Sequence, residues 1–148
     1  MRITDILTIE HAVFRAMFNE IEGALLKSAT VVEVRVLART MTALLHHHGE
    51  SEQNLAYAAL DHMLKEKGQL NRLYTEHREM DTRFEQTQAA NDFSEASRLL
   101  HSAMVMSRDH FRYEEQTLFP LINDILQDES LEKLGDAWKQ RHASLRQD

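Results

Sequence analysis

The segment His110-Phe-Arg-Tyr-Glu114-Glu-Gln-Thr-Leu-Phe-Pro120 places two metal-binding side chains within an apolar helical stripe. His110 and Glu114 are four residues apart, so on a helix they lie one turn apart on the same face. That face also carries the apolar residues Ala103, Met106 and Leu121. A buried charge is costly unless it is paired or bound to a metal. The segment therefore predicts a helix whose core-facing side carries a candidate metal-binding pair.

The composition narrows the classes of protein to which the chain can belong. The formal charge of −7 argues against a nucleic-acid partner and against an anionic membrane surface. No apolar run approaches the roughly 20 residues of a membrane span, and the first residues lack a signal-peptide pattern, so we expect a cytoplasmic protein. Nine histidines and no cysteine exclude disulfides and thiolate ligands and make a metal site worth testing.

Apolar residues at spacings of three and four predict an all-α, up-and-down four-helix bundle across about residues 5–127. The first helix ends near residue 27, and residues 28–30 break the pattern. A short extra helix at about residues 130–146 is expected to pack on the bundle as a lid, with a dimer contact as the alternative. We therefore predict that residues 1–148 form a single domain, without a linker or a sequence-level repeat.

Capping residues predict where three of the helices begin. Thr4 or Thr8 is expected to cap the first helix. Two capping boxes, Thr30–Glu33 and Asp92–Glu95, are expected to start the second and fourth helices. Pro120 lies within the fourth helix and is expected to kink it, because proline cannot donate a backbone hydrogen bond.

Each of the four helices carries one histidine within its apolar stripe, and two of them add a glutamate one turn later. These residues are His11, His48, Glu52, His77, His110 and Glu114. A single histidine at such a position is better explained as a core-edge residue bound to a carbonyl. Six polar groups at core positions would destabilise the core unless something binds them, and four-helix bundles build metal sites from facing helices. Gly49 follows the second histidine, weakens the helix slightly and could make room for a close neighbour.

The residue types restrict the metal. Imidazole and carboxylate without thiolate suit iron, manganese or zinc. Six ligands exceed what one tetrahedral zinc needs, and two carboxylates among four imidazoles suit a pair of ions with each carboxylate bridging. A bridging oxide or hydroxide would bring each ion to five donors, which leaves one open position for a small molecule.

The order His, His-x-x-x-Glu, His, His-x-x-x-Glu resembles the hemerythrin-like family, also called HHE cation-binding domains. The matching stretches are Glu10-His11, His48-Gly-Glu-Ser-Glu52, Glu76-His77 and His110-Phe-Arg-Tyr-Glu114. The resemblance implies a bundle that holds two iron ions, oxo- or hydroxo-bridged, and that meets dioxygen, nitric oxide or peroxide. It favours iron over manganese or zinc.

The chain departs from the oxygen-carrying members of that family. They have two histidines one turn apart on the third helix, whereas Leu73 precedes His77 here and Asp81 follows it. Both ions could then be open, which argues against reversible oxygen carriage. Asp81 could supply a seventh ligand, although a solvent-facing aspartate is the favoured interpretation. Tyr113 could donate a hydrogen bond near the site, and Gln53 stands where the family often has a second glutamate.

We expect a binding or sensing protein for dioxygen, nitric oxide or peroxide rather than an enzyme, acting as a monomer or weak dimer. The expected apolar pocket is lined by Phe14, Phe18, Leu44, Leu73 and Met106. A peroxide-reducing or other oxidative enzyme, or an iron-handling protein, is the alternative. A metal-free helical adaptor with structural histidines is a third hypothesis.

Overall fold

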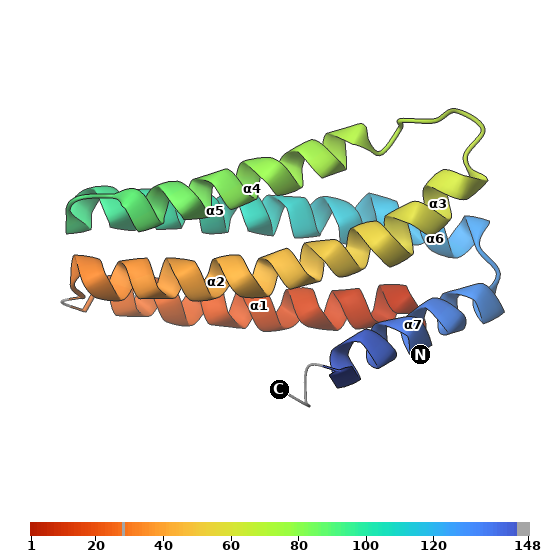
Figure 1. Cartoon of the computed structure of the whole chain (residues 1–148), viewed down its shortest axis with the longest axis horizontal. Coiled ribbons are helices and arrows are strands. Elements are labelled where there is room, and N and C mark those ends of the chain that lie inside the picture. The colour runs from red at the N-terminus through yellow and green to blue at the C-terminus, as the bar shows by residue number, and fades with distance from the viewer. Residues whose placement is uncertain (28, 145–148) are drawn as a thin grey trace.

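The long helices of the chain lie side by side as a bundle (Figure 1). The computed structural model describes residues 1–27 and 29–144, within which all regular secondary structure is helical. The elements are α1 (Ile3–Leu25), α2 (Val31–Ser51), the π-helical segment η1 (Glu52–Tyr57), α3 (Ala58–Met63), α4 (Asn71–Ala89), α5 (Phe93–Tyr113), the π-helical segment η2 (Glu114–Leu118), α6 (Phe119–Ile125) and α7 (Asp128–Ser144). The predicted all-α four-helix bundle with a C-terminal extra helix is confirmed. The break predicted at Ser28 and residues 145–146 of the predicted last helix lie outside the described residues.

The second and fourth helices start where their capping residues predicted. The Thr30 hydroxyl accepts the backbone N–H of Glu33 at 3.2 Å, and the Glu33 carboxylate accepts the N–H of Thr30 at 2.6 Å. Asp92 accepts the N–H of Glu95 at 2.9 Å, but the Glu95 carboxylate accepts the N–H of Asn91 instead of completing the box. Both helices therefore have a side-chain cap, and the second of the two predicted capping boxes is only half formed.

The predicted cap of the first helix is wrong. α1 begins at Ile3, so both threonines lie inside it. The buried Thr4 hydroxyl donates to the Asn123 side-chain oxygen at 2.8 Å, and the Thr8 hydroxyl donates to the Thr4 carbonyl at 2.8 Å. A tertiary contact to α6 therefore uses the hydroxyl that sequence reasoning assigned to the cap.

Two predicted core residues are exposed, for different reasons. Leu44 is 41% exposed, because α2 turns Met41 and the partly buried Leu45 inward instead. Leu121 is 40% exposed, because η2 intervenes between it and Glu114. A π turn holds more residues than an α turn, so the inward position moves one residue on, to Ile122. Pro120 lies in the first turn of α6, where its missing N–H costs little.

The core has two apolar clusters. One, around Phe18, Phe84 and Phe111, lies towards the α1–α2 turn. The other, around Leu7, Tyr57 and Leu131, lies where α7 packs against α1 and η1. Gly135 of α7 passes so close to the Met1 carbonyl that an added Cβ would overlap it. Within the described residues, no helix combines the length and the apolar character needed to cross a membrane.

Candidate metal centre

The structure brings all six predicted residues together between the two apolar clusters. Each is buried: His11 0%, His48 3%, Glu52 0%, His77 8%, His110 3% and Glu114 0% exposed. They come from four elements of the bundle and from the π-helical segments that continue two of them. The residue set that the helical period selected is therefore a cluster in space.

The four imidazoles form two pairs. The Nε2 atoms of His11 and His48 lie 3.0 Å apart, and those of His77 and His110 lie 2.9 Å apart. Two nitrogens that bind one ion at about 2.1 Å with a right angle between them lie about 3.0 Å apart. Each pair therefore has the spacing of two ligands on one ion.

The two carboxylates connect these pairs. Glu52 Oε1 lies 3.2 Å from His11 Nε2 and 3.0 Å from His48 Nε2, and its Oε2 lies 3.3 Å from His77 Nε2. Glu114 Oε2 lies 3.3 Å from His11 Nε2, and its Oε1 lies 3.4 Å from His110 Nε2. Each carboxylate thus directs one oxygen to each pair, as a bridging ligand does.

Two of these carboxylate oxygens have no hydrogen bond. Glu52 Oε2 and Glu114 Oε2 are fully buried and accept no hydrogen bond. Leaving such an atom unsatisfied is costly, whereas a cation beside it would satisfy it. Two groups of ligand atoms are close enough to hold a metal, Glu52–His77–His110–Glu114 and His11–His48–Glu52. The donor set therefore fits two cations.

The outward nitrogen of each histidine is also held. Nδ1 of His11 lies 2.9 Å from Glu115, that of His48 lies 3.0 Å from Glu10, and that of His110 lies 2.8 Å from Glu76. A carboxylate in this position accepts the Nδ1 proton, which directs the Nε2 lone pair inward and makes it more basic. The fourth histidine differs, because the amide nitrogen of Gln53 lies 2.7 Å from His77 Nδ1. Sequence reasoning noted Glu10, Glu76 and Gln53 within motifs but did not assign them to this role.

The electrostatics of the cluster favour positive charge. Burial opposes a charge on His48, but Glu52 and Glu10 outweigh it and raise its pKa to about 10. Burial likewise opposes a charge on His110, and Glu114 with other carboxylates raises its pKa to about 9. Burial raises the pKa of Glu52, but the surrounding histidines outweigh it and hold that pKa well below its usual range. Protons or metal cations can supply the charge that the cluster attracts.

A tyrosine at the site was missed. The buried Tyr57 hydroxyl donates to Glu114 Oε1 and lies 3.4 Å from His77 Nε2, and its ring stacks on His77 with centroids 5.6 Å apart. Burial and the nearby carboxylates raise its pKa, so it stays protonated. Five residues after Glu52, an α-helix would point this side chain away, but η1 turns it back. Tyr113, which sequence reasoning considered, is 37% exposed beneath the Arg72 guanidinium.

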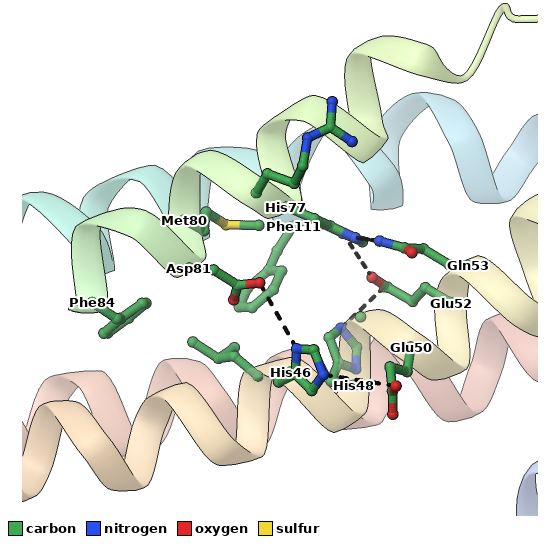
Figure 2. Close-up of a pocket in the computed structure, with 13 residues that line it drawn as sticks. His46, His48, Glu50, Glu52, Gln53, His77, Met80, Asp81, Phe84 and Phe111 are labelled. Carbon is green, nitrogen blue, oxygen red and sulfur yellow. Dashed lines mark hydrogen bonds and ion pairs between the residues drawn. The ribbon is translucent and has the colours of Figure 1, made fainter. Parts of the chain in front are cut away.

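A cavity of about 200 Å³ between α2 and α4 reaches the cluster (Figure 2). Its apolar walls include Leu45, Met80, Phe84 and Phe111, and it extends to His48, Glu52 and His77. None of the five residues predicted to line the apolar pocket lines this cavity, so that prediction was wrong. Gly49 lies against the His77 ring, and an added Cβ would lie 3.4 Å from His77 Nδ1, in ordinary van der Waals contact. Asp81 lies among the lining residues, 3.8 Å from His46 Nδ1, with a partly exposed side chain, and it is not one of the clustered ligand atoms.

The centre has an approximate twofold repeat, which extends beyond the two His-x-x-x-Glu pairs that the sequence shows. The Glu-His pairs of α1 and α4 correspond, as do the His-x-x-x-Glu segments that lead into η1 and η2. Even the caps correspond, since Thr30 and Asp92 lie eighteen residues before His48 and His110. The ring contacts also correspond: Tyr57 stacks on His77 and Phe119 stacks on His11, each with ring centroids 5.6 Å apart.

A helical bundle with two bridged histidine pairs in its interior defines a class of metal-binding domain. The comparison with known families agrees, because the model of the hemerythrin HHE cation-binding domain matches residues 2–122 and, in a second alignment, residues 69–148. The chain belongs to the hemerythrin HHE cation-binding domain family. No curated protein and no solved structure matches it.

Proposed function

We propose that the protein holds two iron ions and binds or senses dioxygen or a related small molecule, such as nitric oxide or peroxide. The observation that carries the proposal is the bridging arrangement, in which each of two buried carboxylates directs one oxygen to each imidazole pair. His11 and His48 would hold one ion, His77 and His110 the other, and Glu52 and Glu114 would bridge them. Bound iron supplies reversible redox chemistry and positions for a small ligand.

The chain's own residues supply the surroundings of such a centre. The carboxylates of Glu10, Glu76 and Glu115 orient three of the imidazoles. Phe111 stacks on His11 with centroids 4.1 Å apart and shields that side from water. The apolar cavity beside His77 favours small neutral molecules over ions, because apolar walls do not compensate a charge for lost hydration.

Metal analysis tests the proposal directly. After expression in iron-replete medium, we expect two iron ions per chain, and azide or nitric oxide should change the visible spectrum of the loaded protein. His77→Ala should lower the iron content, whereas His47→Ala is the matched control because His47 is exposed beside His48. Less than one iron per chain in the unaltered protein would contradict the proposal and favour a metal-free adaptor.

Tyr57 favours peroxide turnover as a second candidate function. Its hydroxyl is a buried proton donor that contacts Glu114 and lies 3.4 Å from His77 Nε2. Disproportionation of two hydrogen peroxide molecules into two waters and dioxygen balances without an added reductant, and it requires protons to move at the site. Tyr57→Phe should abolish steady-state peroxide consumption and retain the iron. Consumption no faster than that of free iron in the unaltered protein would remove this candidate.

A further inference from the structure

The twofold repeat of the centre is broken at one side. Three of the four histidines have a glutamate at Nδ1, and only His77 has an amide, that of Gln53. Glu115, which corresponds to Gln53, is itself fixed by two hydrogen bonds from Arg15, at 2.8 and 3.0 Å. The residue that corresponds to Arg15, four positions after the histidine, is Asp81. An acid–base pair on one side is thus replaced by an amide and an acid on the other.

This replacement weakens the hold on His77. A carboxylate only accepts hydrogen bonds, so it keeps the proton on Nδ1 and the lone pair of Nε2 free for a metal. An amide can turn over and present either its oxygen or its NH₂ group. When the NH₂ group faces Nδ1, the imidazole proton must lie on Nε2, and that nitrogen cannot bind a metal. Losing such a carboxylate partner typically lowers metal affinity by about 10- to 100-fold.

Tyr57 acts in the same direction. Its hydroxyl donates to Glu114 Oε1, the carboxylate oxygen that lies 3.4 Å from His110 Nε2. That hydrogen bond draws electron density from an oxygen that would bind the ion between His77 and His110. Phe119, the corresponding residue on the other side, has no group that could do this.

The same side is also the more accessible one. Gly49 stands where the other side has Phe111, so the cavity reaches the His77 ring, whereas Phe111 covers the His11 ring. His48 also borders this cavity. Figure 2 shows His77 and Gln53 together beside this space. Of the six clustered residues, His77 is the most exposed, at 8%. A chelator or water can therefore approach this position more easily.

We propose that the two metal positions are unequal, and that the ion held by His77 and His110 is the exchangeable one, bound last and lost first. The proposal rests on the two-ion function above. It predicts a stable one-ion state in which His11, His48 and Glu52 retain their metal. The protein could therefore respond to iron supply by gaining or losing one ion without unfolding.

Iron release from the full-length protein tests this. The protein is loaded anaerobically with ferrous iron and mixed with excess chromophoric chelator. We expect two phases of equal amplitude with rates at least 10-fold apart. His77→Ala should remove the fast phase and leave the slow one. Release in a single phase, or a fast phase that survives His77→Ala, would overturn the inference and leave the two-ion function intact. Failure to bind iron at all would instead contradict the proposed function.

Variants that make the two sides alike provide the matched controls. Gln53→Glu with Asp81→Arg copies the Glu115–Arg15 pair to the open side and should slow the fast phase towards the slow one. Glu115→Gln gives His11 an amide partner like that of His77, so both ions should leave quickly. Tyr57→Phe should also slow the fast phase. Faster release from Tyr57→Phe than from the unaltered protein would show that the tyrosine holds the ion, which would overturn its part in the inference.

Discussion

The two sides of the centre share their ligands and differ in what surrounds them. On the His11 side, Phe111 and Phe119 cover the imidazole and the Glu115–Arg15 pair fixes it. On the His77 side, the corresponding residues are Gly49, Tyr57, Gln53 and Asp81. If the centre holds two ions as proposed, the comparison teaches that ligand type sets which ions can bind, whereas the neighbouring residues set how firmly each ion is held and what can reach it. We call these the closed side and the open side.

Removing the cover of the closed side should have the largest effect on stability. Phe111 is almost fully buried, so Phe111→Ala should lower the free energy of unfolding by about 4 kcal/mol through lost burial and a new cavity. Denaturant unfolding measures this. If the closed side depends on this ring for shielding, the variant should also release its second iron faster. A decrease in the free energy of unfolding below about 1 kcal/mol would contradict a packing role for the Phe111 ring.

Removing the metals should lower stability next. A ligand present at a hundred times its dissociation constant stabilises the folded state by about 2.7 kcal/mol, so chelation should lower the melting temperature. Glu52→Ala should have the same effect, because its carboxylate reaches both sides. Glu50→Ala is the control, since Glu50 points to surface histidines. Equal melting temperatures with and without chelator would contradict the metal-site assignment on both sides.

The pH dependence should reverse when metal is removed. In the metal-free protein, the raised pKa of His48, about 10, and of His110, about 9, contributes stability that is complete below about pH 6.5 and is lost as pH rises through 9–10. The lowered pKa of Glu52 contributes stability that is lost below about pH 4.5. Metal-free protein should therefore be most stable between these limits and should lose stability steadily as the pH rises to 9 and above.

The metal-loaded protein should show the opposite slope, because metal binding requires neutral imidazole and protons compete with it. Thermal melting against pH, with and without chelator, measures both curves. NMR titration of the metal-free protein tests both sides, since His48 of the closed side and His110 of the open side should each keep their proton well above the usual pKa of histidine. Parallel curves would contradict the charge balance derived for the cluster.

The smallest expected effect comes from narrowing the open side. Gly49→Ala puts a methyl group 3.4 Å from His77 Nδ1, and alanine also favours the helix. Stability should change by less than about 1 kcal/mol, while nitric oxide binding to the loaded protein should slow several-fold. Stopped-flow spectroscopy measures the rate. An unchanged rate with unchanged iron content would mean that small ligands do not approach through this cavity.

Much of the centre could be predicted, because polar residues at core positions are costly and therefore informative. All six clustered residues were found from helical period alone. Their neighbours were not, because glutamate and glutamine beside a histidine are common on solvated faces. The errors at Leu121 and Tyr57 share one cause: Tyr57 ends one π-helical segment and Leu121 follows the other, so a count based on the α-helix assigns the wrong face. The prediction that Leu44 lies in the core was wrong because Leu44 and Leu45 are adjacent leucines and only one of them can point inward.

Each π turn begins at a glutamate that contacts both imidazole pairs, so it acts as a one-residue insertion in a helix at the histidine–glutamate cluster. Before each π turn, the helix directs its histidine into the centre. After the turn, the helix directs apolar side chains into the cluster beneath α7. The π turn therefore allows the histidine and the later apolar side chains to face inward independently of each other. Deleting the exposed Asn54 would restore an ordinary helix and rotate Tyr57 out of the centre without touching a single ligand. Relatives with and without this tyrosine could thus be one residue apart in length rather than different in design.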